Sequence, residues 1–219
     1  MVHRGVSVRP AFLTDRRGRM TASAEIRIVE LERRLVGGYQ LLQALVGIRL
    51  RSVTDPESRR HLTWLSDVVA AMGLLTRRTV EDGSVDFGAY LDEAAGFWRR
   101  ACEDRAVRID VRASGIDLPE SHALPLAIIL HELMSNAVRH AFPGSGRGSI
   151  AVAYSQASDG VSLVVRDSGV GAQSLSNGDG LALVEGLVAH LGGAMTLETA
   201  PNAGVGVRVR LPIRSERPH

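Results

Sequence analysis

Hydrophobic residues recur at helical spacing as far as about residue 78, and beyond it they follow a mixed pattern of short strands and helices. The first helical stretch, near 22–50, carries a stripe of apolar residues three or four positions apart. Its members are Ile28, Leu31, Leu35, Leu42 and Leu45, and Gly38 fills the one gap in the series. The second stretch, near 56–78, carries Leu62, Leu65, Val69 and Met72 on one face. Two amphipathic helices with a short connection predict an antiparallel hairpin.

The connection between the two helices lies at 52–56. Thr54 or Asp55 can cap the second helix there, and Pro56 suits its first turn. A hairpin by itself leaves apolar surface exposed along its length. A second copy of the chain would bury that surface by forming a four-helix bundle. We therefore expect a homodimer through residues 22–78.

After residue 80 the pattern predicts a mixed domain, so the expected fold class is α+β. Helices are expected near 87–104, 123–141 and 180–191, and strands near 107–113, 149–156, 160–167, 193–199 and 204–211. The expected organisation is a disordered basic tail at 1–20, a dimerisation hairpin at 21–79, the mixed domain at 80–213 and a short tail at 214–219.

Charge and composition exclude several classes of protein. The sequence pI is about 9.2, yet the formal net charge is only +2, because every basic residue counted among the 26 Lys and Arg is Arg, which stays protonated to very high pH. We therefore expect no nucleic-acid partner. No apolar run is long enough for a membrane helix or a signal peptide, so a cytoplasmic protein without a membrane partner is expected. The single cysteine, Cys102, is given no role.

A polar face follows the helix expected near 123–141. Glu132, Asn136, Arg139 and His140 fall at spacings of four, three and one, whereas Leu126, Ile129, Leu130, Leu133 and Ala137 form the core stripe. Carboxylate and amide oxygens on such a face can hold Mg²⁺, and Arg139 or His140 can bind phosphate. A solvated helix face gives the same spacing.

The strand expected at 160–167 ends in Asp167, which is followed by Gly169 and Gly171. Asp167 can accept a hydrogen bond from an exocyclic amine, and the glycines let the backbone approach a planar ring. The next motif is Gly178-Asp179-Gly180-Leu181, which opens a helix. A helix start preceded by glycine presents free N–H groups to phosphate oxygens.

The order of these motifs is more specific than any one of them. A helix with Glu-x-x-x-Asn, a strand with Asp-x-Gly-x-Gly, Gly-x-Gly-Leu and a final strand preceded by Gly204 and Gly206 resemble the GHKL ATPase fold of gyrase, Hsp90, histidine kinases and MutL. Within that group His131 to Gly144 resembles bacterial histidine kinases with a dimerisation segment of the HisKA_2 type, related to the HWE kinases. The resemblance covers about residues 22–213 and implies a Bergerat α/β sandwich at 80–213.

The resemblance also implies roles for individual residues. Glu132 would orient or activate the reacting groups and could contact Mg²⁺, Asn136 would hold Mg²⁺, and Asp167 would read the adenine amine. The residues implied to border ATP are Asn136, Arg139, His140, Asp167, Gly169, Gly171, Gly178, Gly180 and Leu181. Arg139 stands where many relatives have Lys.

Two features depart from the family pattern. The segment between Gly171 and Gly178 makes a very short ATP lid. In the first helix, Arg33 stands where relatives carry the phosphoacceptor histidine, and Val36, Gly37 and Gly38 replace the Lys-Asn-Asn that follows it. Arg33 therefore marks a degenerate phosphoacceptor position. His61 lacks the family motif, and His131 and His140 are assigned to the nucleotide site.

The sequence is compatible with three functions. One is a degenerate kinase or regulator that binds ATP and engages a response regulator receiver domain or a partner histidine kinase without autophosphorylating. Another is an active kinase, phosphotransferase or phosphatase that acts in trans on such a partner. The third is a serine kinase of the anti-sigma-factor type, which the hairpin disfavours because those kinases generally lack it. Acceptor loss favours the first, since it removes the nucleophile while the ATP motifs remain usable.

Overall fold

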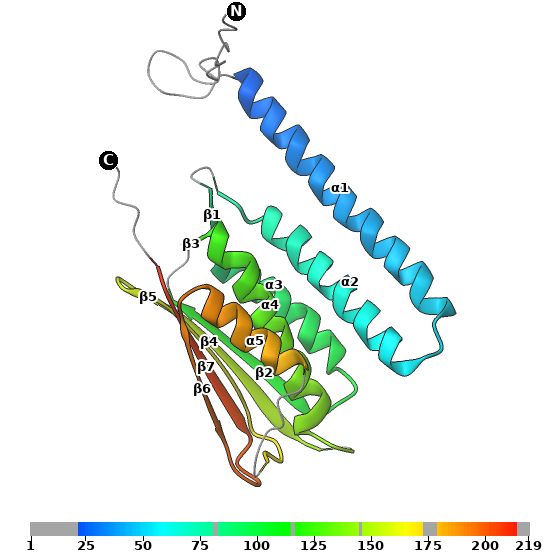
Figure 1. Cartoon of the computed structure of the whole chain (residues 1–219), viewed down its shortest axis with the longest axis vertical. Coiled ribbons are helices and arrows are strands. Elements are labelled where there is room, and N and C mark those ends of the chain that lie inside the picture. The colour runs from blue at the N-terminus through cyan, green and yellow to red at the C-terminus, as the bar shows by residue number, and fades with distance from the viewer. Residues whose placement is uncertain (1–21, 81–82, 115–116, 145, 173–178, 214–219) are drawn as a thin grey trace, which may run out of the picture.

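Two long helices precede an α/β sandwich in the computed structural model of the chain (Figure 1). The structure describes residues 22–80, 83–114, 117–144, 146–172 and 179–213. The tails expected at 1–20 and 214–219 lie outside these residues. The expected fold class, α+β with a helical hairpin followed by an α/β sandwich, is confirmed.

The hairpin consists of α1 (Ala22–Ser52) and α2 (Pro56–Thr76). Asp55 caps α2, because its carboxylate accepts a hydrogen bond from the Ser58 backbone N–H at 2.7 Å. The predicted connection is thus confirmed. α1 continues without a break through Gly37 and Gly38, and a Cβ added at either glycine would meet nothing within 4 Å. Neither glycine is therefore required by packing among the described residues.

The sandwich has one mixed sheet of five strands in the order β2-β4-β5-β7-β6. β2 pairs in parallel with β4, and the other neighbours pair antiparallel. Helices α3, α4 and α5 cover one face of the sheet (Figure 1). The strands are β2 (Val107–Ser114), β4 (Gly148–Ala157), β5 (Gly160–Asp167), β6 (Ala194–Thr199) and β7 (Val205–Pro212). The helices are α3 (Phe87–Ala101), α4 (Glu120–Asn136) and α5 (Asp179–His190).

The core lies between the helices and the sheet, and α2 contributes to it. Phe87 of α3 contacts Tyr154 of β4 with ring centroids 5.1 Å apart. Ala71 and Leu75 of α2 belong to the same buried cluster. The hairpin is therefore packed onto the sandwich through its second helix, while α1 packs against α2. Cys102 is buried, and burial raises the pKa of its thiol, which suits a residue without a chemical role.

Two features differ from the sequence prediction. Short strands β1 (Ser84–Asp86) and β3 (Asp117–Pro119) form a separate two-stranded sheet that was not expected. The helix expected to reach residue 141 ends at Asn136 and continues as a π-helical turn, η1 (Ala137–Ala141). Among the described helices, none combines the length and apolar character that crossing a membrane requires.

Candidate nucleotide-binding site

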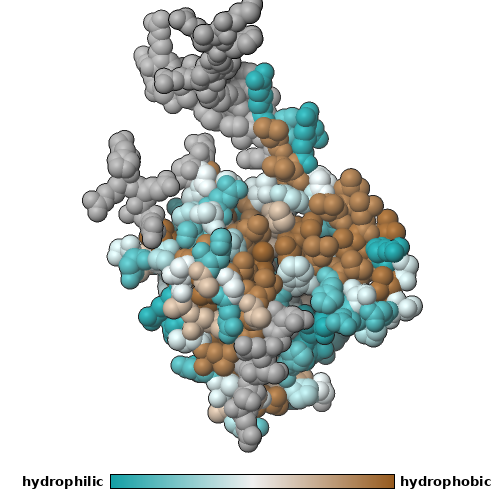
Figure 2. Space-filling view, in the orientation of Figure 1, coloured by the Kyte–Doolittle hydropathy of each residue, from teal (hydrophilic) through white to brown (hydrophobic). Residues whose placement is uncertain are grey.

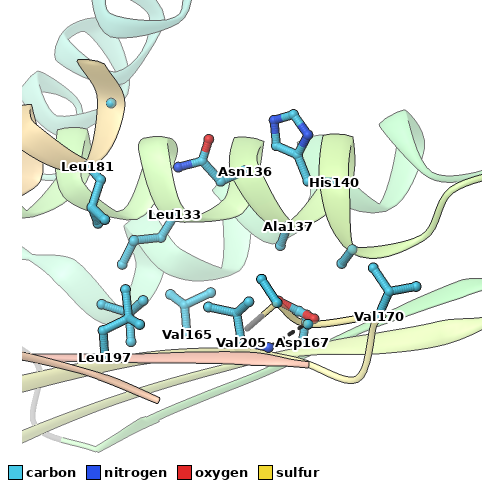
Figure 3. Close-up of a pocket in the computed structure, with 15 residues that line it drawn as sticks. Leu133, Asn136, Ala137, His140, Val165, Asp167, Val170, Leu181, Leu197 and Val205 are labelled. Carbon is cyan, nitrogen blue, oxygen red and sulfur yellow. Dashed lines mark hydrogen bonds between the residues drawn. The ribbon is translucent and has the colours of Figure 1, made fainter. Parts of the chain in front are cut away.

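A mostly apolar cavity of about 380 Å³, called here the apolar pocket, lies between α4 and the sheet. Figure 3 shows Leu133 and Ala137 pointing from the helix toward the strands that carry Val165 and Val205. Its full lining is Leu133, Asn136, Ala137, His140, Ala141, Val165, Asp167, Val170, Gly171, Ala172, Gly180, Leu181, Leu197, Val205 and Val207. Apolar walls with a few polar groups are typical of small-ligand pockets.

Asp167 is the acidic residue of the apolar pocket. It is the last residue of β5 and is only 6% exposed. Its Oδ1 accepts hydrogen bonds from the backbone N–H groups of Gly169, at 2.8 Å, and Val205, at 3.3 Å. These bonds offset the cost of burying the carboxylate and fix its orientation. A carboxylate held in this way can accept a hydrogen bond from an exocyclic amine of a purine.

The glycines after Asp167 let the loop pass close to other backbone. A Cβ at Gly169 would collide with the carbonyl oxygen of Ala141, and one at Gly171, where φ is +58°, would collide with that of Ala200. Thr199 fixes the same loop, since its Oγ1 accepts from the Ala172 N–H at 3.0 Å. Thr199 was not predicted to lie here, because a threonine at the end of a strand carries no distinguishing local signal.

A second cavity of about 460 Å³, called here the polar hollow, adjoins the apolar pocket. The two cavities share Asn136, His140 and Gly180. In Figure 3, Asn136 and His140 lie on the side of the helix away from the strands. The remaining lining of the polar hollow is Arg60, His61, Trp64, Glu132, Arg139 and Leu183. The four residues predicted to share one polar face of the helix therefore line one cavity.

Glu132 is buried at 5% exposure and lies against the start of α5. A Cβ added at Gly180 would lie 2.5 Å from Glu132 Oε2, so a larger residue there would displace this carboxylate or the start of α5. Arg139 donates a hydrogen bond to Ser135 Oγ. Both Arg139 and His140 lie in the π-helical turn, a distortion that is common at functional sites because it redirects side chains.

Glu132 and Asn136 carry oxygens of the kind that Mg²⁺ prefers, and both line the polar hollow. No group of three or more His, Cys, Asp or Glu side chains among the described residues could hold a metal ion. Mg²⁺ at nucleotide sites is usually held by one or two protein oxygens together with substrate phosphates. The residues present therefore fit a cation that arrives with a nucleotide.

Among the described residues, three that the sequence singled out line neither cavity: Arg33, Gly169 and His131. Arg33 lies exposed on α1, where it pairs with Glu30 at 3.0 Å. Gly178 lies outside the described residues. The assignment of His131 to the nucleotide site is wrong. One residue along the helix from Glu132, it turns toward α2, with Nε2 3.3 Å from Asp67 Oδ2 and its ring 5.2 Å from that of Trp98.

Known proteins match both the sandwich and the longer chain. Residues 121–215 match the family "Histidine kinase-, DNA gyrase B-, and HSP90-like ATPase". Sensor histidine kinase PdtaS of Mycobacterium tuberculosis is 29% identical over 221 residues, which cover 95% of this chain and 44% of that protein. Blue-light-activated histidine kinase 1 of Erythrobacter litoralis is 26% identical over 202 residues, covering 89% of this chain and 55% of that protein. The chain thus spans about half the length of these relatives.

Solved structures show the same fold. The histidine kinase domain of the Erythrobacter litoralis EL346 blue-light activated histidine kinase superposes with a TM-score of 0.62 at 21% identity, covering 79% of this chain and 95% of that domain. The longer EL346 structure gives a TM-score of 0.64 at 23% identity, covering 89% of this chain and 61% of the other. The sandwich of this chain therefore resembles the histidine kinase-, gyrase B- and HSP90-like ATPases over residues 121–215, and the chain shares its fold with a solved histidine kinase domain.

Proposed function

We propose that the chain binds Mg·ATP and acts in two-component signalling as a degenerate kinase or regulator. It engages a response regulator or a partner histidine kinase rather than autophosphorylating a histidine of its first helix. The observation that carries this proposal is the pairing of two adjoining cavities, one apolar with Asp167 and one polar with Glu132, Asn136, Arg139 and His140.

The apolar pocket suits adenine better than guanine. Its apolar residues can contact both faces of a purine, and the Asp167 carboxylate accepts a hydrogen bond from an amine at the six position. Guanine carries an acceptor oxygen there, which would face the carboxylate without a proton between them. Gly171 and Gly180 border this pocket, as does Leu181. The polar hollow then receives the phosphates, because its cations and amide match their charge.

The hairpin supports a role through a partner. α1 contains no histidine, and Arg33 cannot replace one, since a guanidinium stays protonated and offers no lone pair for phosphoryl transfer. Arg33 and Arg34 both bind Glu30 and are exposed, so this stretch of α1 presents cations to solvent. Such a surface suits an acidic partner such as the aspartate-rich pocket of a receiver domain.

A homodimer through the hairpin forms part of the proposal. Apolar side chains gather over the hairpin helices in Figure 2. On α1 the large exposed ones are Val29, Leu31, Leu35, Leu41, Leu42, Leu45 and Ile48. A row of this length on one helix is typical of an association surface, and a second copy of the same helix would cover it.

The alternative function, phosphoryl transfer in trans, is favoured by one observation. Glu132 is a buried carboxylate that lines the polar hollow, where it can orient a nucleophile or accept its proton. The partner would then supply the acceptor. This alternative differs from the proposed function only in whether the terminal phosphate leaves ATP.

Titration calorimetry with Mg·ATP, followed by incubation with γ-labelled ATP, tests the proposal. Asp167→Asn removes a charge-assisted hydrogen bond, so its ATP affinity should fall about 10- to 100-fold, and exposed Asp159→Asn should change nothing. The wild-type chain should acquire no acid-labile, alkali-stable label. Equal ATP affinities for the wild type and Asp167→Asn would contradict the assignment of Asp167 to the nucleotide-binding site. Label transferred to a receiver domain would establish the trans-acting alternative.

A further inference from the structure

The second hairpin helix forms one wall of the polar hollow. Arg60, His61 and Trp64 of α2 lie across this cavity from α4 and η1. None of the described residues of α2 lines the apolar pocket. The hairpin thus contributes only to the polar hollow, which Asp167 does not line.

The two cavities indicate how a bound nucleotide is oriented. This inference rests on the proposed function. The purine is fixed by Asp167 in the apolar pocket, and the chain of phosphates passes the shared residues Asn136, His140 and Gly180. The last phosphate then lies in the part of the polar hollow that Arg60 and His61 line. We infer that Arg60 and His61 bind the terminal phosphate of ATP, so that the hairpin itself distinguishes ATP from ADP.

The charges in the hollow fit this role. On the sandwich side, Glu132 repels phosphate, and Arg139 is already bound to Ser135. On the hairpin side, Arg60 and His61 each form an ion pair with Glu57 alone within the described part of the chain, at 3.9 and 3.8 Å. Both distances exceed a hydrogen bond, and all three side chains are largely exposed, so these contacts are weak. A phosphate replaces them readily, and the guanidinium can bind it in a bidentate manner.

Contacts that involve no nucleotide hold α2 against the sandwich. Asp67 lies six residues along the helix from His61, about 9 Å at the ordinary rise of a helix, and pairs with the buried His131 of α4. Leu75 anchors the same helix farther along in the core of the sandwich. Arg60 and His61 are therefore carried on a helix already fixed against the ATPase domain, which lowers the entropy cost of binding phosphate.

The test compares a nonhydrolysable ATP analogue with ADP, both with Mg²⁺, on the full chain by calorimetry. Arg60→Ala should weaken the analogue about 10- to 100-fold and His61→Ala about 3- to 10-fold, with ADP affinity unchanged in both. Arg60→Lys should recover part of the lost affinity, because lysine restores the positive charge but not the paired N–H donors of the guanidinium. Arg49→Ala, which removes an exposed cation of α1, is the matched control and should affect neither nucleotide.

The inference is overturned if the variants weaken the analogue and ADP equally, or weaken neither. Failure of the proposed function gives a different result, because wild type and Asp167→Asn would then bind adenine nucleotides equally or not at all. Hydrogen exchange of residues 56–64 gives an independent measurement in the wild type, and the analogue should slow it more than ADP does. Acid-labile label on His61 after incubation with γ-labelled ATP would support the contact while contradicting the proposed absence of autophosphorylation.

Discussion

At the scale of single residues, the site depends on two buried carboxylates, one in each cavity. Asp167 is held by backbone N–H groups at the end of a strand, and Glu132 projects from a helix toward the first turn of α5. Burying a carboxylate costs several kcal/mol unless its partners compensate. Two such residues beside adjoining cavities therefore indicate selection for binding or chemistry rather than for stability alone.

Gly180→Ala should weaken Mg·ATP binding at least about 10-fold. The added Cβ would lie 2.5 Å from Glu132 Oε2, so either the carboxylate or the start of α5 must move, and both line the polar hollow. Calorimetry measures the loss. Gly186→Ala on the same helix is the matched control, since its Cβ would meet nothing within 4 Å. That variant should bind ATP normally and be more stable by about 0.5–1 kcal/mol. Unchanged binding in Gly180→Ala would show that Glu132 can move without consequence.

The site residues that can be predicted from the sequence are those whose signals are local. Asp167, Gly169 and Gly171 follow one another at the end of a predicted strand, and the structure gives each glycine a backbone neighbour that a side chain would strike. Arg60 and Thr199 could not be found in this way. Arg60 reaches the polar hollow, and Thr199 reaches Ala172 at the apolar pocket, only because segments far apart in sequence pack together. No pattern near either residue encodes that packing.

At the scale of elements, α2 connects the hairpin to the sandwich by three different contacts. Ala71 and Leu75 contribute apolar surface to the core, and Asp67 pairs with His131. At the end of the helix, the arginines at 77 and 78 bind Glu93 of α3 at 3.4 and 2.7 Å. The last contact is exposed, so it contributes little energy, but it depends on pH.

Glu93→Gln should lower the free energy of unfolding at pH 7 by about 0.2–1 kcal/mol. The hydrogen bond from Arg78, with a smaller effect of Arg77, holds the pKa of Glu93 below its usual value. A carboxylate with a lowered pKa stabilises the folded chain at neutral pH, and that stabilisation is lost as the pH falls through the lowered pKa. The difference between wild type and variant in urea unfolding should therefore disappear in acid.

Glu103→Gln serves as the control for this prediction. Glu103 is an exposed carboxylate just beyond α3 and takes part in none of the ion pairs of the described residues. Its substitution should leave stability within about 0.5 kcal/mol of the wild type at every pH. A Glu93 variant that behaved in the same way would mean that this ion pair adds nothing to the docking of α2.

The elements that were not predicted from the sequence are those whose residues show little periodic pattern. β1 and β3 have three residues each, too few for an alternating pattern to be recognised. The π-helical turn has the composition of an α-helix and differs from one only in its hydrogen bonding. The predicted helix therefore included it. His131 was misplaced because a step of one residue on a helix rotates the side chain by about 100°. That rotation carries it from the nucleotide face to the face that contacts α2.

At the scale of the whole molecule, the two helices of the hairpin have different partners. α2 packs against the sandwich and against α1, whereas much of α1 faces solvent in the single chain (Figure 1). Leu35 is 52% exposed and Leu42 48%, and both lie beside Gly38 along one shallow groove. Covering this groove with a second chain would place two nucleotide sites in one assembly.

Leu35→Glu combined with Leu42→Glu should convert the proposed homodimer into a monomer. Charges placed on an apolar association surface must be desolvated for the dimer to form, whereas both positions are already half exposed in the single chain. Light scattering across micromolar concentrations should therefore give twice the chain mass for wild type and the chain mass for the variant. Val80→Glu, at an exposed apolar residue beyond the hairpin helices, should leave the dimer intact.

Nucleotide binding separates loss of association from loss of folding. The two leucines line neither the apolar pocket nor the polar hollow, so the monomeric variant should bind Mg·ATP with unchanged affinity. A wild-type chain that is monomeric throughout this concentration range would contradict the proposed dimer. The exposed row on α1 would then have to be a surface for a different protein, and the cations at 33 and 34 beside it would favour an acidic one.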